Sequence, residues 1–158
     1  MLASSSYSSS HIYGYGFEFE YKETKFAEFL KNHKNSFCIS DQEKELYSKF
    51  EAYAKEKNWK EIEFLLADYS GEANGIQNVG SVVANIMYRE TGIRFVYCLP
   101  DGDCDTPEAI LFEQAYPWSF TERELLLTEE ELQEICLRYM DELGISDEPD
   151  YLSQEYYG

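Results

Sequence analysis

The sequence predicts an α+β fold, a compact single domain in which about five helices pack against a small, three-stranded antiparallel sheet. Residues 11–21 alternate, with aromatic side chains at every second position, as in a strand with one aromatic face. Two further apolar runs, 93–99 and 109–116, flank a loop at 100–108 and predict a pair of antiparallel strands. The other apolar residues recur at helical spacing.

The chain opens with a serine-rich segment, because six of residues 1–10 are serine, and we expect this segment to be disordered. The strand at 11–21 follows and is expected beside one strand of the later pair. Gly14 and Gly16 leave room for a close neighbour on the face opposite the aromatic one. The aromatic face carries Tyr13, Tyr15, Phe17, Phe19 and Tyr21.

Four helices are predicted before the second strand. Ser40 and Glu43 have the spacing of a capping box, in which each side chain bonds to the other residue's backbone N–H. His33 falls on the inner side of the first helix, where a hydrogen-bonded structural histidine is the commoner outcome. The predicted helical ranges are 24–34, 40–57, 59–69 and 76–92.

Two more helices are predicted after the strand pair. Thr121 and Glu124 have the capping-box spacing for a short helix. Thr128 and Glu131 predict a stronger capping box than the one at Thr121. It begins an amphipathic helix that ends at Gly144. The domain is therefore predicted to span 11–145, with a partly ordered, acidic, tyrosine-rich tail at 146–158. The inward stripe of the last helix comprises Leu132, Ile135, Cys136, Tyr139, Met140 and Leu143.

Charge is distributed unevenly along the chain. The 158 residues carry a net charge of −18, yet residues 1–60 hold nine Lys and nine Asp or Glu. The excess lies entirely beyond residue 60, and 15 negative charges of it follow Pro100. Such a chain repels nucleic acid, which excludes direct DNA or RNA binding. A net charge of about 2–8 suffices to keep a small domain soluble, so the surplus favours a positively charged partner.

Compartment and membrane association follow from other features. No stretch approaches the roughly 20 apolar residues of a membrane span, so no membrane association is expected. The N-terminus has neither the basic nor the apolar region of a secretory signal, and the four cysteines form no CxxC pair. We therefore expect a cytoplasmic protein with reduced cysteines.

Catalytic motifs are sparse. The sequence has no P-loop, no GxGxxG after a strand, no GxSxG and only two histidines, so we expect a non-enzymatic protein without a cofactor, catalytic residue or metal site. Asp101, Asp103 and Asp105 alternate as at the start of an EF-hand loop. The match then fails, since Thr106 replaces the required glycine and Phe112 the bidentate glutamate. A solvated loop is favoured, and a small metal-dependent enzyme using these aspartates is the weakest alternative.

The last helix predicts a binding surface. Glu130, Glu134 and Asp141 project outward over about 16 Å of helix axis, with Leu137 and Arg138 beside them. Duplex DNA carries one negative charge per about 1.7 Å, so this edge approximates part of its field. An ordinary solvated helix face is the competing interpretation. The predicted partner-binding set is Asp101, Asp103, Asp105, Glu122, Glu130, Glu134, Leu137 and Asp141.

In composition the chain is similar to nucleic-acid mimics, including phage-encoded inhibitors of host nucleases and of CRISPR effectors. This likeness rests on charge and size, and no motif matches a particular family. It implies an inhibitor that occupies the basic surface of a nuclease or another nucleic-acid-binding protein. The alternative is an immunity-type or structural protein that binds through its aromatic strand at 11–21.

Overall fold

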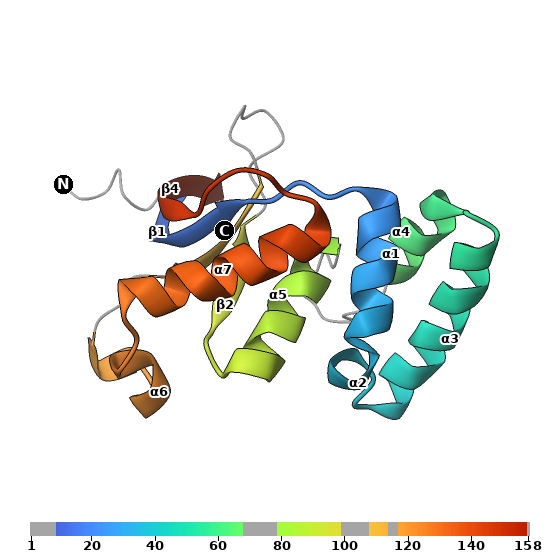
Figure 1. The fold of residues 1–158 in the computed structure, drawn as a ribbon, viewed down its shortest axis with the longest axis horizontal. Coiled ribbons are helices and arrows are strands. Elements are labelled where there is room, and N and C mark those ends of the chain that lie inside the picture. The colour runs from blue at the N-terminus through green and yellow to red at the C-terminus, as the bar shows by residue number, and fades with distance from the viewer. Residues whose placement is uncertain (1–8, 68–78, 99–107, 114–116, 158) are drawn as a thin grey trace.

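The computed structural model describes residues 9–67, 79–98, 108–113 and 117–157 (Figure 1). Within these ranges it contains seven α-helices and a four-stranded antiparallel sheet, which confirms the α+β prediction. The sequence predicted three strands, and the fourth, at residues 150–157, was missed. Asp101, Asp103 and Asp105 lie outside the described ranges.

The sheet has the strand order β2-β3-β1-β4, with antiparallel neighbours throughout. β1 is therefore an interior strand, and its pairing with β3 confirms the expected neighbour. On its aromatic face Tyr15, Phe17 and Phe19 are buried. The strands are β1 (Ser9–Glu18), β2 (Phe95–Cys98), β3 (Ala109–Glu113) and β4 (Asp150–Tyr157).

β4 corrects the expectation of a partly ordered tail. Its residues pair with the free edge of β1, and Tyr151 stacks on Tyr13 with ring centroids 5.9 Å apart. Tyr151 also meets Tyr15 edge-on at 5.1 Å. The tail forms a strand because the partner edge is supplied from the other end of the domain, which local periodicity does not reveal. β1 also begins at Ser9, inside the segment expected to be disordered.

Gly16 allows a close approach between β1 and β3. A Cβ atom at this position would lie 1.9 Å from the carbonyl oxygen of Ile110. No side chain fits there, which explains the glycine that the strand pattern singled out.

The helices pack on one face of the sheet. Figure 1 shows α7 crossing in front of the strands with α5 beside it, and α1 stands at the C-terminal end of α7, with α3 and α4 beyond. The whole predicted inward stripe of α7 is buried. The helices are α1 (Glu23–Asn32), α2 (Lys34–Phe37), α3 (Asp41–Lys55), α4 (Trp59–Ala67), α5 (Val79–Thr91), α6 (Glu122–Leu125) and α7 (Glu129–Leu143), with a 3₁₀ turn, η2 (Pro117–Ser119).

The end of the first helix differs from the sequence prediction. The helix expected over 24–34 ends at Asn32, and His33 separates it from the short α2. The side chain of His33 bonds to two carboxylates from other helices, and this tertiary contact accompanies the break. The predicted extensions of α4 to residue 69 and of α5 back to residue 76 lie outside the described ranges.

The capping box that the sequence favoured over the one at Thr121 is the incomplete one in the structure. The boxes at Ser40 and Thr121 have both reciprocal bonds. At Thr128 the hydroxyl accepts from the N–H of Glu131 at 3.1 Å, but the Glu131 carboxylate pairs with Arg123 at 2.5 Å. A charged partner on α6 therefore competes with the second bond of the box that the sequence favoured.

Candidate functional site

The outer side of α7 carries a ridge of four exposed residues, Glu130, Glu134, Leu137 and Asp141. Their spacing of four, three and four residues aligns them along one side of the helix. This side is opposite the buried stripe, and Leu137 is 43% exposed between the acidic residues. The structure thus brings together four of the eight predicted binding residues. We call this set the α7 ridge.

The carboxylates of the α7 ridge have no cationic partner among the ion pairs that the described ranges contain. Two other α7 carboxylates do, since Glu131 pairs with Arg123 and Glu142 with His33, each at 2.5 Å. Arg138 lies one turn beyond Glu134, but its guanidinium sits 4.8 Å from the centre of the Tyr139 ring. The ridge is therefore a line of uncompensated negative charge.

Glu122, the remaining described member of the predicted set, is exposed in the first turn of α6. α6 precedes α7 by a short turn, so this carboxylate lies at the same end of the molecule as the N-terminus of α7 (Figure 1). The ridge and Glu122 thus lie on two consecutive helices.

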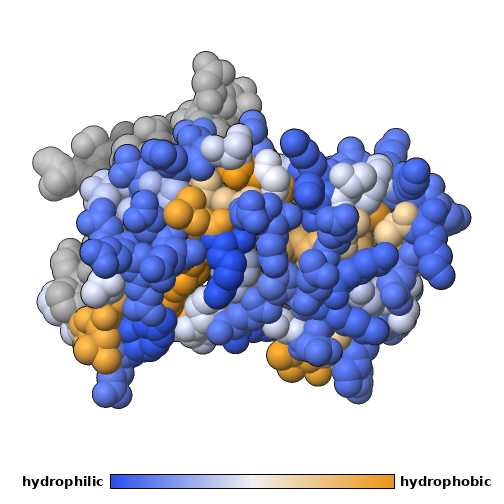
Figure 2. Space-filling model, viewed as in Figure 1, coloured by the Kyte–Doolittle hydropathy of each residue, from blue (hydrophilic) through white to orange (hydrophobic). Residues whose placement is uncertain are grey.

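Exposed apolar residues near α6 were missed by the sequence prediction. Trp118 is 80% exposed, Leu125 55% and Leu126 73%. Figure 2 shows hydrophobic side chains gathered at the lower left, over α6, beside the hydrophilic surface along α7. The signal in the sequence was the run of three leucines at 125–127, which is more apolar surface than a four-residue helix can bury.

A groove of about 240 Å³ lies between the α6–α7 turn and the sheet. Its aromatic side includes Phe112 and Phe120, whose ring centroids are 5.3 Å apart. We call this cavity the α6–α7 groove. It is lined by Phe112, Phe120, Glu124, Leu125, Leu127, Thr128, Glu129, Leu132 and Tyr151.

Glu124, at one side of this groove, serves the fold. Its buried carboxylate accepts hydrogen bonds from Arg94 Nη2 at 2.6 Å, from Arg94 Nε at 3.0 Å and from the Thr121 N–H at 3.0 Å. Burial alone raises the pKa of Glu124, but the bonds from Arg94 and the backbone outweigh it and lower the pKa to about 2. The carboxylate is thus ionised and fully engaged.

Glu43 repeats this arrangement at the start of α3. It is the glutamate of the Ser40 capping box, and its side chain is 7% exposed. Arg89 Nη2 donates to it at 2.7 Å, while Arg89 Nη1 bonds to the carbonyls of Ser36 and Phe37. Arg89 and Arg94, at the two ends of the α5–β2 connection, therefore each fix the first turn of another helix.

His33 lies between two carboxylates. Its Nδ1 is 2.7 Å from Glu90 and its Nε2 is 2.5 Å from Glu142. Glu90 also accepts from the hydroxyls of Ser36 at 2.5 Å and Tyr139 at 2.6 Å. Burial lowers the pKa of His33, but the two carboxylates outweigh it and raise that pKa. The doubly protonated imidazolium satisfies both contacts and joins α5 and α7 to the end of α1, so we assign His33 a structural role.

The aromatic strand offers little contact surface. Tyr15, Phe17 and Phe19 lie in the core, and Tyr13, at 51%, is the exposed member of that face in the described residues.

The part of the chain that the structure describes contains no group of three His, Cys, Asp or Glu side chains that would hold a metal ion. Nor is any helix in it long and apolar enough to cross a bilayer.

Comparison with models of protein families, with curated proteins and with solved structures found no match.

Proposed function

We propose that this chain is a non-enzymatic binding protein whose α7 ridge occupies a basic surface of a nucleic-acid-handling protein and thereby inhibits it. The observation that carries the proposal is the alignment of Glu130, Glu134 and Asp141 on one exposed side of α7 without a cationic partner among the described ion pairs. Uncompensated like charges on one helix destabilise it slightly. Binding to a positively charged partner relieves this repulsion, and the relief adds to the affinity.

The dimensions of the ridge favour a surface that normally binds nucleic acid. Glu130 and Asp141 are separated by about 16 Å along the helix axis, given a rise of about 1.5 Å per residue. Such a rod resembles a short piece of phosphate backbone in length and sign, although it carries fewer charges than duplex DNA does. A groove built for phosphates therefore provides cations at a suitable spacing.

Leu137 adds an apolar contact in the middle of the acidic line. It is 43% exposed and lies between Glu134 and Asp141 on the ridge. Protein interfaces usually combine a central apolar contact with a charged rim. This arrangement favours a folded protein partner over diffuse attraction of small cations.

The test is partner capture followed by a salt titration. The immobilised chain is exposed to lysate from its source cells, and a retained nucleic-acid-binding protein is then purified and titrated. We expect the affinity to fall roughly tenfold or more between about 50 and 200 mM salt, and duplex DNA to compete for the same site. An affinity that is independent of salt, or a complex that DNA does not displace, would refute the mechanism.

Matched variants locate the surface. Glu130→Gln, Glu134→Gln and Asp141→Asn are combined in one ridge variant. The control combines Glu28→Gln, Glu51→Gln and Glu56→Gln, which are exposed on α1, on α3 and just after α3. Both triple variants have a net charge of −15 instead of −18. If net charge alone governed the affinity for the partner, both variants would lose the same amount of it. We expect only the ridge variant to lose affinity, by roughly tenfold or more.

A further inference from the structure

The α6–α7 groove combines an apolar interior with a charged edge. Leu127 and Leu132 provide aliphatic surface, and Phe112 and Phe120 provide aromatic surface. At its margin the groove is lined by the ring of Tyr151, which is 38% exposed, and by Glu129 in the first turn of α7. A site of this kind suits a ligand with an apolar stem and a cationic end.

The size of the groove indicates one side chain. Its volume is about 240 Å³. Pockets for small molecules and cofactors usually have about 300–1,000 Å³, so this groove is smaller than that class. It is large enough for a long side chain inserted from a partner.

The electrostatics of the groove favour a cation. Glu124 is neutralised by Arg94, and Glu131, just outside, by Arg123. Glu129 is absent from the ion pairs of the described ranges, and after burial it is the largest cause that raises the pKa of Tyr151. The positive end of the α7 dipole amounts to about half a charge, less than the full charge of Glu129. The net field at this edge is therefore negative.

We propose that the α6–α7 groove receives an arginine side chain from the basic partner, with the stem along Leu127 and Leu132 and the guanidinium between Glu129 and the Tyr151 ring. This rests on the proposed function, because it specifies how the partner of the α7 ridge is anchored. Arginine fits better than lysine, because its planar, weakly hydrated guanidinium stacks on aromatic rings and bonds to a carboxylate with two donors. The exposed Leu125 at the rim of the groove offers apolar contact to the residues that flank the arginine.

The test uses a defined probe and does not need the natural partner. N-acetyl-arginine amide is titrated into the ¹⁵N-labelled protein, and N-acetyl-citrulline amide, a neutral molecule of nearly the same shape, serves as the control. We expect the arginine probe to shift the amide signals of Leu127, Thr128, Glu129 and Tyr151 in a saturable way. The citrulline probe should bind at least about threefold more weakly.

Variants at the margin of the groove sharpen the test. Glu129→Gln and Tyr151→Leu should each weaken the arginine probe about two- to fivefold, because they remove the carboxylate and the aromatic face. Tyr151→Phe keeps the aromatic face and should retain binding, as should Glu28→Gln on α1, which does not line the groove. All three substituted positions are exposed, and circular dichroism verifies that each of the four variants is folded.

Three outcomes would overturn the arginine anchor. The first is the absence of saturable shifts at the groove, and the second is equal binding of the citrulline probe. The third is a shift of the groove signals with protein concentration alone, which would make a second copy of the chain the occupant. The proposed function fails separately, when the ridge variant keeps full affinity for the captured partner although the arginine probe still binds the groove.

Discussion

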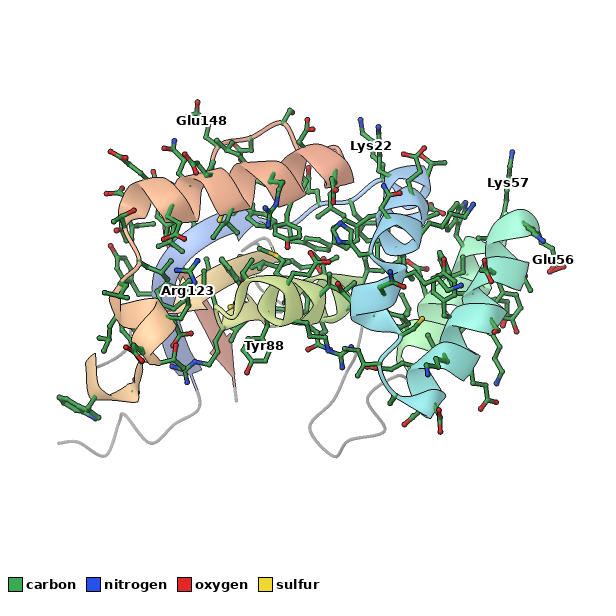
Figure 3. The ribbon with its side chains drawn as sticks, turned by 60° about the horizontal axis from the view of Figure 1, so that its bottom comes forward. Lys22, Glu56, Lys57, Tyr88, Arg123 and Glu148 are labelled. Atoms are coloured by element: carbon green, nitrogen blue, oxygen red, sulfur yellow. The ribbon has the colours of Figure 1, made fainter. Side chains whose placement is uncertain are left out.

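The two ends of the molecule differ in net charge, because one end is nearly balanced and the other is strongly acidic. At the end formed by α1 to α4, residues 23–67 contain eight Lys and nine Asp or Glu. At the other end, residues 117–152 contain two Arg and eleven Asp or Glu. In Figure 3, Lys22, Glu56 and Lys57 lie toward the first end, and Arg123 and Glu148 lie toward the second. The imbalance along the sequence is thus an imbalance in space.

The comparison shows that glutamates with different roles look alike in the sequence. At each end one glutamate is buried against an arginine, Glu43 with Arg89 and Glu124 with Arg94. The two cations of the acidic end are engaged too, Arg123 with Glu131 and Arg138 over Tyr139. The surplus carboxylates there remain on the surface.

The largest effect is expected where a buried carboxylate is removed. Glu43→Ala and Glu124→Ala each leave an arginine and two backbone N–H groups without their acceptor, at a cost of about 3 kcal/mol in the free energy of unfolding. Urea denaturation measures this cost. Glu45→Ala is the control, because Glu45 is 74% exposed and lies 3.8 Å from Lys49, so it should change stability by less than about 0.5 kcal/mol. Equal losses at all three sites would contradict the distinction between buried and surface glutamates.

A smaller effect is expected from pH at the junction of the two ends, where His33 contacts Glu90 and Glu142. The pKa of His33 is higher in the folded than in the unfolded state, so its contribution is complete below the unfolded value of about 6.5. It is lost as the pH rises from there through the folded pKa. Denaturation midpoints should fall over this range.

His33→Gln provides the comparison for the pH series. The variant cannot carry the charge, so its stability should be lower at acidic pH and should lack the fall above about pH 6.5. Parallel pH curves for the two proteins would show that other groups govern this range.

The smallest effect, with the opposite sign, is expected for the α7 ridge. Neutralising Glu130, Glu134 and Asp141 together removes repulsion along the helix and the unfavourable charge of Asp141 in the last turn. These gains oppose the loss of the favourable charge of Glu130 in the first turn, and the net free energy of unfolding should rise by a few tenths of a kcal/mol. Thermal denaturation at low salt measures the gain, and it should shrink in high salt because surface charges are screened. A clear loss of stability would mean that the ridge serves the fold and would weaken its assignment as a binding surface.

The sequence predicted what depends on neighbours in the chain. The buried stripe of α7, its end at Gly144 and the caps at Ser40, Thr121 and Thr128 all follow from residues within one or two turns. The ridge was predicted with them, because the outer side of a helix is fixed once its inner side is known.

What the sequence did not predict depends on distant partners. Arg89 is 46 residues from Glu43 and Arg94 is 30 residues from Glu124, so no local pattern marks these pairs. The α6–α7 groove likewise requires Phe112 and Tyr151 to come from different strands. The leucine run at 125–127 was the sequence's indication that apolar surface would be exposed there.

The pairing of β4 with β1 has a consequence for the order of folding. Gly16 and Asp150 are register partners although 134 positions separate them, so this half of the sheet closes only after a very long loop has been brought together. Until then β1 presents one unpaired edge to the solvent, and such an edge can pair with a neighbouring chain. Fast docking of residues 150–157 would therefore shorten the time during which a newly made molecule presents this edge to its neighbours.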